Sequence, residues 1–474
     1  MKTYDLIVIG GGAGGLTVAA GASSLGAKVA LIEKEQQPGG DCLHYGCVPS
    51  KTLISIANRI YNMRSASSYG LHATGTIRMT EVKERIQEVI SHIQVHDDAD
   101  RFRKLGVDIY IGKGNFLNEH EVEIQGNETI YGKRMVLSTG SRPFIPNIEG
   151  LQESGFLTNE TIFDLESLPK KLAVIGGGPI GIELAQAFSR LGSEVTVFER
   201  GKTILPKEDK EIRERAFEFL SKEMHFSFEA SVTRIKEENG QKQMTVMIDG
   251  TEEELVVDAI LLATGRIPNS DQLELKNAGI HVDQQGYIPV NERLQTNVSH
   301  IYAIGDVNGT LPFTHVAGLE GKLVVQNAVL GLRRKIQYSE VPWVTYTTPE
   351  IFHLGETEEE LKDKNQPHLV YQTSLSEVDR FVADGETEGL VKILTDQKGR
   401  IIGAHAIGKG AGDWMQTVVL AMKEKKKIGD LSQMVYPYPN HAAAIQRTAD
   451  SYWREKLFQG WIPRLIKKYI QTFR

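Results

Sequence analysis

The sequence predicts an α/β protein built from two copies of one strand–glycine turn–helix–strand unit, followed by a mixed α+β domain. Glycines in G-x-G-x-x-G spacing follow a short apolar run at residue 10 and again at residue 176. In both places a helix-like stretch and a second apolar run come next. A chain of 474 residues is also too long for a single core and indicates two to four domains.

Composition excludes several classes of protein. Hydrophobic residues at 41% and charged residues at 24% are ordinary globular values, and a net charge of −7 gives no reason to expect nucleic acid as a partner. No apolar run approaches the length of a transmembrane helix. The start, MKTYDLIVIGGG, passes directly into a strand and a turn without a signal-peptide pattern. We therefore expect a cytoplasmic protein.

The first unit begins with DLIVIG, residues 5–10, an apolar run that fits a buried parallel strand. It leads into Gly10, Gly12 and Gly15, then into the helix-like LTVAAGASSLG, and a second strand ends at Glu33. The first glycine permits the turn, the second lets a pyrophosphate approach the backbone, and the third lets helix and strand pack. The helix start favours phosphate, and Glu33 suits ribose hydroxyls. This order of features predicts a dinucleotide site.

The second unit runs from KKLAVIG through Gly176, Gly178 and Gly181 to Glu199 at the end of EVTVFER. Two copies predict two Rossmann-like dinucleotide-binding domains and two cofactors, most simply FAD and a nicotinamide nucleotide. Glu199 favours the free 2′-hydroxyl of NADH and repels the 2′-phosphate of NADPH. The neighbouring Arg200 could accommodate a phosphate, so NADPH stays open as the alternative to NADH.

The two cysteines of the chain, Cys42 and Cys47, lie together in GGDCLHYGCVPSK. They are too few for a secreted disulfide scaffold, and two ligands make a poor zinc site. Helical spacing from Pro49 onward places Cys47 near a helix N-terminus, where the dipole favours a thiolate, and Lys51 adds positive charge. The pair could close into a disulfide, while buried unpaired thiols are the alternative. The pattern predicts a redox pair.

The segment GGDCLHYGCVPSK between the two glycine units resembles the FAD-dependent pyridine nucleotide–disulfide oxidoreductases. That family includes dihydrolipoamide dehydrogenase, glutathione reductase and mercuric reductase. The resemblance covers essentially the whole chain and extends to STGSRPFIPNIEG, LLATGRIPN, IYAIGDVNG, THVAGLEG and TPEIFHLGETEEE. It implies a three-layer, glutathione-reductase-like fold. The FAD domain would comprise residues 1–150 and 270–340, the NAD(P) domain 151–269, and the dimerisation domain 341–474.

The resemblance also implies roles for individual residues. Cys47 would face the flavin as a charge-transfer thiolate, Cys42 would exchange with the acceptor, and Lys51 would lie near the flavin paired with Glu183. A solvated helix carboxylate is the alternative for Glu183. The expected FAD contacts are Gly10, Gly12, Gly15, Glu33, Lys34, Gly40, Lys51, Gly114, Thr139, Gly140, Asp306 and Ala317. The expected NAD contacts are Gly176, Gly178, Gly181, Glu199, Val232 and Gly265.

The implied reaction takes electrons from NADH through the flavin to a Cys42–Cys47 disulfide. The dithiol would then reduce a disulfide, a metal ion or another small oxidant, and the enzyme would be a homodimer without a metal cofactor. The alternatives are a diaphorase or quinone reductase with direct flavin-to-acceptor transfer, a dihydrolipoamide dehydrogenase, or a redox sensor without a turnover substrate.

The C-terminal region departs from the family pattern. Thiol-acting relatives carry His-Pro-Thr followed three residues later by a glutamate, but VYPYPNHAAAIQR places Tyr438 in the histidine position and Ala443 in the glutamate position. Tyrosine, with a pKa near 10, is a poor proton shuttle but a good hydrogen-bond donor. The chain is therefore nearest a mercuric-reductase-like branch that lacks the second cysteine pair. His441 has no carboxylate at the matching offset, and we expect an ordinary histidine rather than a relocated base.

The tail, residues 453–474, carries six basic residues against one acid. Its apolar side chains fall near one helical face: Trp461, Leu465, Ile466, Tyr469, Ile470 and Phe473. We expect this helix to dock on its own subunit or on the dimer partner. Peripheral contact with an anionic membrane is the alternative, which would make the protein membrane-associated.

Overall fold

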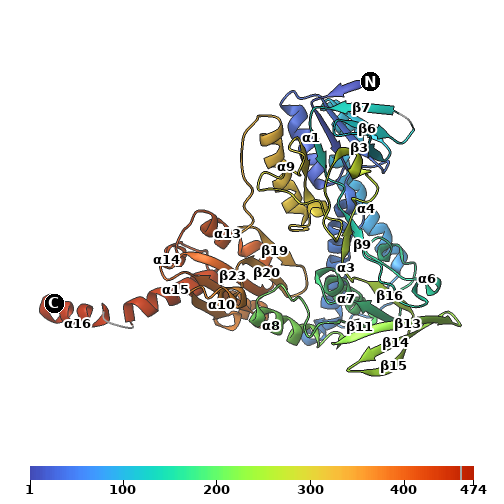
Figure 1. Ribbon diagram of the computed structural model, residues 1–474. Helices are drawn as coiled ribbons and strands as arrows, with labels where there is room; N and C mark the ends of the chain where they lie inside the picture. Colours follow the sequence, from blue (N-terminus) through green and yellow to red (C-terminus); the bar gives the residue numbers. More distant parts are fainter. Residues whose placement is uncertain (127, 459–461, 474) are drawn as a thin grey trace. The chain divides into compact units, whose positions relative to one another are not determined.

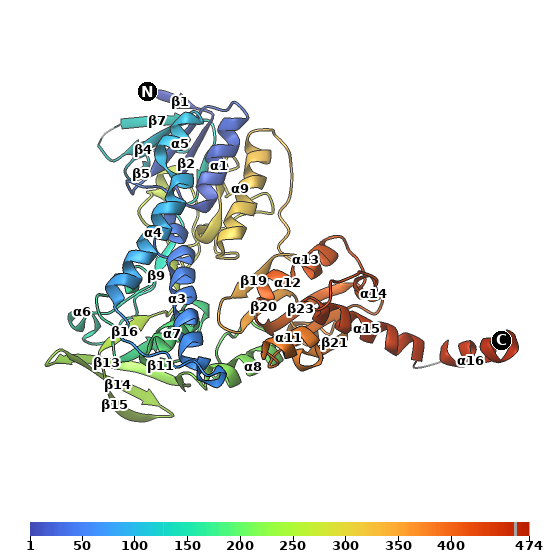
Figure 2. The ribbon, with the colours of Figure 1, turned by 180° about the vertical axis from the view of Figure 1, so that it is seen from behind.

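The structure is a computed structural model that describes residues 1–126, 128–458 and 462–473. The chain forms two compact units, one of Met1–Arg200 with Phe226–Gln337 and the other of Gly201–His225 with Tyr338–Arg474. Residues 201–225 lie inside the range predicted for the NAD(P) domain but belong to the second unit. The division into three domains stays a prediction. Figures 1 and 2 show the elements from two sides.

A five-stranded parallel sheet forms the centre of the first unit, in the order β18-β8-β2-β3-β4. Its strands are β2 (Leu6–Ile9), β3 (Val29–Glu33), β4 (Val107–Ile111), β8 (Met135–Leu137) and β18 (Ile301–Ala303). Helices α1 (Ala13–Ser24) and α9 (Thr314–Ala328) lie side by side on one face (Figure 1). The other face packs against a second sheet of β1 (Lys2–Tyr4), β5 (Gly114–Phe116), β6 (Glu121–Ile124) and β7 (Glu128–Gly132).

Strand β2 shows why its sequence is continuously apolar. Leu6 and Val8 pack into the cluster under the helices, whereas Ile7 and Ile9 pack into the cluster under the second sheet. A strand with both faces buried needs apolar side chains at every position. The predicted α/β class with parallel sheets is confirmed.

The same arrangement is repeated further along the chain. Strand β10 (Lys171–Ile175) pairs in parallel with β11 (Glu194–Phe198) and β16 (Ala259–Leu262), and the sheet order is β12-β11-β10-β16. Helix α7 (Pro179–Leu191) connects β10 to β11. An antiparallel sheet of β13 (Ala230–Glu238), β14 (Gln241–Ile248) and β15 (Thr251–Val257) shares a buried apolar cluster with β10 and β16. Strand β12 spans His225–Ser227.

Short elements link the two sheets and position the cysteines. Strand β9 (Ser141–Pro143) pairs with β17 (Arg266–Pro268), so the two segments that connect the halves run antiparallel. The helix predicted from Pro49 begins at Cys47. The remaining helices are α2 (Gly40–His44), α3 (Cys47–Ser65), α4 (Met79–Asp97), α5 (Ala99–Lys104), α6 (Leu151–Ser154), η1 (Ala66–Tyr69), η2 (Ile162–Asp164), η3 (Leu275–Ala278) and η4 (Gly305–Asn308).

The second unit contains an antiparallel sheet in the order β19-β20-β23-β22-β21, with one face covered by helices. The strands are β19 (Pro342–Thr345), β20 (Glu350–Gly355), β21 (Leu369–Ser374), β22 (Leu390–Thr395) and β23 (Ile401–Gly408). The helices are α8 (Lys210–Leu220), α10 (Glu358–Asp363), α11 (Asp379–Asp384), α12 (Ala411–Trp414), α13 (Gln416–Lys423), α14 (Ile428–Ser432), α15 (Ala443–Phe458), α16 (Ile462–Phe473) and η5 (Leu375–Glu377). Helices α12 and α13 are separated by Met415 alone.

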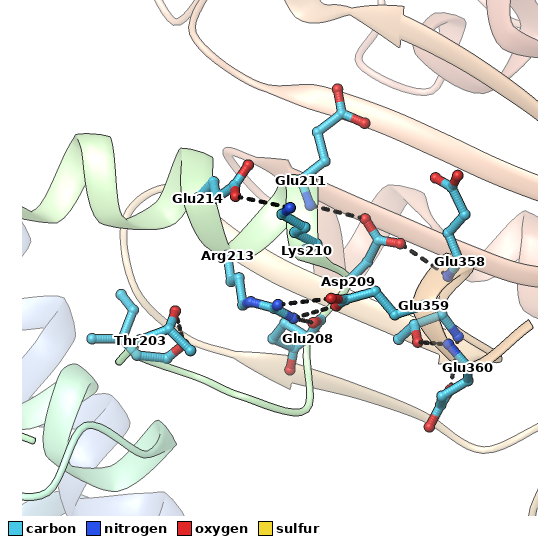
Figure 3. Close-up of polar contacts among 12 residues, drawn as sticks. Thr203, Glu208, Asp209, Lys210, Glu211, Arg213, Glu214, Glu358, Glu359 and Glu360 are labelled. Carbon is cyan, nitrogen blue, oxygen red and sulfur yellow. Dashed lines mark hydrogen bonds and ion pairs between the residues drawn. The ribbon is translucent and has the colours of Figure 1, made fainter. Parts of the chain in front are cut away.

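Charged side chains connect α8 and its N-cap, Asp209, to the sheet and to α10 of the second unit. Figure 3 shows Arg213 of α8 beside Glu359, and Asp209 beside Glu358. Lys392 on β22 is 2% exposed, and its Nζ lies 3.0 Å from Asp209 Oδ1 and 2.5 Å from Glu358 Oε2. Arg213 of α8 donates to both oxygens of Glu359, at 2.6 and 3.1 Å. These pairs explain why residues 201–225 form one unit with residues 338–474, although the intervening chain belongs to the other unit.

The tail forms helix α16, and no helix among the described residues is long and apolar enough to cross a membrane. Trp461 lies outside the described residues. Five side chains of the predicted apolar face are exposed: Leu465, Ile466, Tyr469, Ile470 and Phe473. The described part of the same subunit therefore leaves these side chains uncovered. Docking on the dimer partner, the other half of the expectation, stays a prediction.

Candidate redox and dinucleotide sites

The first glycine turn has a backbone that only glycine accommodates at two positions. Gly10 has a φ of +105°, and a Cβ there would clash with the carbonyl of Ser138. A Cβ on Gly15 would clash with the carbonyl oxygen of Gly10. Gly12 is the N-cap of α1 and has no side chain to occupy the leading N–H groups, and the first turn contains no acidic residue. The turn can therefore receive an anion at the positive end of the helix.

The second turn reproduces this backbone. Gly176 has a φ of +116°, Gly178 is the N-cap of α7, and a Cβ on Gly181 would clash with the carbonyl oxygen of Gly176. The extended φ and ψ of the two N-caps agree, at −83° and −173° for Gly12 and −79° and 177° for Gly178. The sequence repeat is thus a repeat of three-dimensional structure.

Each turn also holds the acid at the end of its second strand. The backbone N–H of Gly11 donates to Glu33 Oε2 at 2.5 Å, and that of Gly177 donates to Glu199 Oε2 at 2.7 Å. Glu33 is buried, at 6% exposed. A carboxylate fixed beside the glycine turn is suitably placed to accept hydrogen bonds from a ribose.

The other residues predicted to contact FAD lie in the first unit in several settings. Gly40 packs against Gly12. Thr139 Oγ1 donates a hydrogen bond to the carbonyl oxygen of Asn269 at 2.8 Å. Asp306 Oδ2 accepts a hydrogen bond from Ser141 Oγ at 2.5 Å. Ala317 packs against Gly14 of α1, and Gly114 lies between side chains of β3 and β6. Lys34 is exposed and forms an ion pair with Glu35. Among the described residues, a Cβ on Gly140, Gly178 or Gly265 would meet open space. Val232 is half-buried on β13.

The cysteine pair is set for thiolate chemistry. Cys42 lies on α2 and Cys47 is the first residue of α3, and both are free thiols in the structure. A hydrogen bond from Cys42, then one from Thr314 and the charge of Lys51, lower the pKa of Cys47 to about 6 against the opposing effect of burial. The same cysteine hydrogen bond, with burial, raises the pKa of Cys42. At neutral pH, Cys47 is therefore the thiolate and Cys42 the protonated thiol.

Lys51 and Glu183 form an ion pair that connects the two halves of the first unit. Lys51 Nζ lies 2.7 Å from Glu183 Oε2, and the Glu183 side chain is 7% exposed. Lys51 is on α3, one turn beyond Cys47, whereas Glu183 comes from the first turn and a half of α7. The family resemblance implied this pair, and the structure contains it. Its place beside a flavin stays a prediction.

Arg266 is a site residue that sequence reasoning did not single out. Its Nη2 lies 3.3 Å from Asp41 Oδ1, its Nε lies 3.8 Å from Asp306 Oδ2, and the same Nε donates to Ser141 Oγ at 2.7 Å. Arg266 is thus connected to the residue before Cys42 and to the predicted flavin contact. The motif LLATGRIPN contains Arg266, but spacing along one strand gives no signal of partners that other segments of the chain supply.

A cavity of about 390 Å³ opens beside the redox loop. Its lining is largely apolar and includes Leu16, Ile93 and Phe102, together with the thiol-bearing Cys42. Asp97 and Arg101 supply charge to its wall, and burial raises the pKa of Asp97. The cavity places a protonated thiol where a small molecule or ion can reach it.

The predicted C-terminal residues lie in the second unit. Tyr438 is 80% exposed, and a hydrogen bond with Asp379 raises its pKa. His441 Nε2 lies 2.9 Å from Asp384 Oδ2, and the same hydrogen bond lowers the pKa of Asp384. The expectation of an ordinary histidine did not anticipate this carboxylate, which comes from α11, 57 residues earlier in the chain. A search for acids near His441 in sequence could not find it.

Comparisons with known proteins give consistent matches. The family model for pyridine nucleotide-disulphide oxidoreductase matches residues 4–321, and the model for the dimerisation domain of that family matches 341–449. The mercuric reductase of Bacillus cereus is 34% identical over 94% of this chain and 70% of its own length. The dihydrolipoyl dehydrogenase of Thermus scotoductus is 32% identical over 96% of this chain and 99% of its own. The Cu(II) complex of the HOCl-induced flavoprotein disulfide reductase RclA from Escherichia coli matches with a TM-score of 0.85 and 27% identity, over 95% of this chain and 100% of that one.

Proposed function

Because the chain belongs to the pyridine nucleotide-disulphide oxidoreductase family, whose members are FAD-dependent enzymes that use NAD(P)H, we propose that it is an NADH-linked reductase acting through Cys42 and Cys47. When bound, FAD supplies two-electron chemistry between the nicotinamide and the cysteine pair. The electron acceptor is a small thiol-reactive species, with a soft metal ion as the first candidate. The match to the dimerisation domain supports a homodimer.

The fit of FAD rests on the first glycine turn. Gly10, Gly12 and Gly15 leave the start of α1 open to a pyrophosphate, and Glu33 is fixed at the turn to hold the ribose. Asp306 supplies a second carboxylate in the same unit. The remaining predicted FAD contacts keep their assignment as part of this proposal.

The preference for NADH rests on the second glycine turn. The start of α7 repeats the open helix end, and Gly177 holds Glu199 at the position where a 2′-substituent would lie. A fixed carboxylate there repels a 2′-phosphate and accepts hydrogen bonds from a 2′-hydroxyl. Gly176, Gly178, Gly181, Val232 and Gly265 complete the proposed NADH site.

The observation that carries the proposed chemistry is the asymmetry of the two thiols. Cys47, with its lowered pKa, keeps a negative charge beside Thr314 and Lys51, whereas Cys42 keeps its proton and lines the cavity. Cys42 is therefore proposed as the thiol that meets the acceptor. Oxidation of the pair, with Cys47 as the thiolate and Cys42 as the thiol, forms one S–S bond and releases one proton and two electrons. These electrons cleave one disulfide to two thiols, reduce one Hg²⁺ to Hg⁰, or reduce two Cu²⁺ to two Cu⁺. Reduction of a disulfide acceptor to two thiols takes up a second proton from solvent.

The choice of a soft metal ion as first candidate rests on the cavity and on two of the relatives. A thiol in a largely apolar wall is a soft ligand, which suits thiophilic metals better than hard cations. Two of the similar proteins are a mercuric reductase and a flavoprotein solved as a Cu(II) complex. Tyr438 is proposed as a hydrogen-bond donor for the bound acceptor rather than as a proton shuttle.

Reduction of a small disulfide is the second candidate. The His441–Asp384 pair favours it, because a histidine oriented by a carboxylate is suited to proton transfer with a thiol. Dihydrolipoyl dehydrogenase of Thermus scotoductus matches over nearly its whole length. This candidate predicts NAD⁺-dependent oxidation of dihydrolipoamide, which metal-ion reduction does not require.

The deciding experiment is steady-state NADH oxidation by the FAD-loaded protein with Cu²⁺, Hg²⁺, small disulfides and quinones as acceptors. We expect turnover with the metal ions, and loss of that turnover in Cys42→Ser and in Cys47→Ser. Quinone reduction in the same variants is the internal control for an intact flavin. Metal turnover that survives in Cys42→Ser/Cys47→Ser would refute the proposal and identify a diaphorase with direct flavin-to-acceptor transfer.

A further inference from the structure

Helix α16 presents an apolar face that the rest of the described chain leaves uncovered. Leu465, Ile466, Tyr469, Ile470 and Phe473 have exposed fractions of 55, 41, 62, 50 and 71%. At about 100° per residue they fall within an arc of about 140° on the helix. Tyr469 and Phe473 contact each other, with ring centroids 5.0 Å apart. Five large apolar side chains on one arc form an exposed apolar patch, and patches of this kind are typical of surfaces that contact a protein or a membrane.

The opposite arc of α16 is basic. Arg464, Lys467 and Lys468 all fall on the side away from the apolar face, and residues 462–473 contain no Asp or Glu. The chain as a whole has a net charge of −7, so this local excess of positive charge runs against its overall balance. The end of α15 adds the exposed Leu457 and Phe458 next to Lys456. Helix α16 and the end of α15 thus both combine apolar and cationic side chains.

The length of α16 decides how it can meet a lipid layer. Twelve residues make a helix of about 18 Å, far short of the roughly 30 Å of hydrocarbon in a bilayer. A helix of this length with one apolar and one basic face lies in the plane of the interface. Its apolar side chains then enter the acyl boundary, and its cations stay among anionic headgroups.

The dimer partner is a less suitable cover. The match to the dimerisation domain of the family ends at residue 449, before the second half of α15 and all of α16. A second copy of this chain has a net negative charge that could attract the basic arc of α16. It would also have to supply an apolar groove for the apolar arc. A lipid surface with anionic headgroups supplies an apolar layer for the apolar arc of α16 and negative charge for its basic arc.

We propose that α16, with the end of α15, is a peripheral docking element for an anionic lipid surface. The site is independent of the acceptor chemistry: the enzyme turns over NADH whether or not the tail is bound. Docking would hold the reductase at a membrane, where apolar acceptors and metal ions concentrated by anionic headgroups are within reach.

The test is flotation of the full-length, FAD-loaded protein with phosphatidylcholine vesicles, with and without phosphatidylglycerol. We expect flotation with the anionic vesicles, and weakening of at least about tenfold when salt is raised until surface charges are screened. The variant Leu465→Ser/Ile470→Ser should lose flotation in all conditions, and Lys467→Gln/Lys468→Gln should lose the preference for anionic lipid. Gln471→Ala, on the polar arc and uncharged, is the matched control and should float like the parent protein.

NADH oxidation and the thermal midpoint should be the same in all four proteins, which separates docking from folding. Absence of flotation in the parent protein would overturn the proposal. Equal flotation of the parent and Leu465→Ser/Ile470→Ser would overturn it as well, because the apolar face would then be irrelevant. A change of molar mass in light scattering for Leu465→Ser/Ile470→Ser, without vesicle binding by the parent, would assign the face to contact between copies of the chain instead.

Discussion

Lys51 Nζ lies 2.7 Å from Glu183 Oε2, so a cation one helical turn from Cys47 is held by a carboxylate of the second glycine unit. Glu183 is almost fully buried, whereas Lys51 is about one-third exposed. The pair joins α3 to α7, and with them the cysteine loop to the segment that begins at the second glycine turn. Charge near the redox pair therefore depends on both halves of the first unit.

Replacing Lys51 should lower the stability of the protein, because Glu183 then stays buried without the positive charge of Lys51. In Lys51→Met, Glu183 loses this partner, and we expect the free energy of unfolding to fall by about 1–3 kcal/mol, a range reduced by the exposure of Lys51. Urea unfolding measures it. The double variant Lys51→Met/Glu183→Leu should recover much of the loss, because an apolar pair does not need solvation. If the double variant is no more stable than Lys51→Met, the ion pair is not the source of the effect.

The asymmetry of the thiols predicts a pH profile for alkylation. Cys47 is a thiolate above its lowered pKa and becomes a thiol below it, so the iodoacetamide rate at Cys47 should rise with a midpoint near pH 6. Cys42→Ala removes the largest cause of the lowering and should move the midpoint upward, toward the ordinary cysteine value. Mass spectrometry of the modified peptide reports the site. A midpoint above pH 8 in the parent protein would contradict the assignment.

Two glycines in the second turn should respond differently to one added methyl group. A Cβ on Gly181 would clash with the carbonyl oxygen of Gly176, so Gly181→Ala should lower stability by about 2 kcal/mol or more. Gly178 has an ordinary φ of −79°, and a Cβ there meets nothing within 4 Å among the described residues. Gly178→Ala should therefore keep the parent thermal midpoint but raise the KM for NADH about tenfold, because the methyl group stands where a pyrophosphate approaches. A normal KM in Gly178→Ala would remove the turn from the NADH site.

The buried cluster around Lys392 should dominate the stability of the second unit. Lys392→Met leaves Asp209, which is 0% exposed, without its nearest cation, and we expect a loss of about 3–5 kcal/mol. Lys409→Met, which removes an exposed lysine 3.4 Å from Glu386, is the control and should cost less than about 1 kcal/mol. Equal losses of stability in the two variants would show that burial of the ion pair does not determine its contribution to stability.

The same cluster predicts the direction of a pH effect. Burial acts to raise the pKa of Asp209 and of Glu358, but neighbouring basic groups, Lys392 among them, hold both below their ordinary values. Groups with lowered folded pKa values stabilise the protein above their unfolded pKa, near 4, and this stability is lost as the pH falls further. Unfolding between pH 6 and pH 3 should therefore be less pH-dependent in Lys392→Met than in the parent protein.

The His441–Asp384 pair predicts a defect in proton transfer that can be repaired. If His441 handles protons for a disulfide acceptor, His441→Gly should slow disulfide turnover about a hundredfold while quinone reduction is unchanged. Added imidazole should restore part of the rate, and Asp384→Asn should give an intermediate loss with a shifted pH–rate profile. A defect without imidazole rescue would assign the pair to structure, through the packing of His441 on Phe381.

The sequence determined the local features of this protein. Spacing of glycines specified both turns, the continuous apolar run LIVI specified a strand buried on two faces, and the run after Cys47 specified its helix. Each of these depends on contacts within a few residues. The resemblance of the cysteine segment added Lys51–Glu183, a contact that local physics alone does not predict.

Only the tertiary structure decided which distant charges meet and which apolar faces stay open. It brought Asp384 to His441, Arg266 to Asp41, and Lys392 to Asp209, and it placed residues 201–225 in the second unit. It also left the apolar arc of α16 exposed. Pairing and burial of this kind depend on how remote segments pack, and periodicity along one segment carries no information about the partner that another segment supplies.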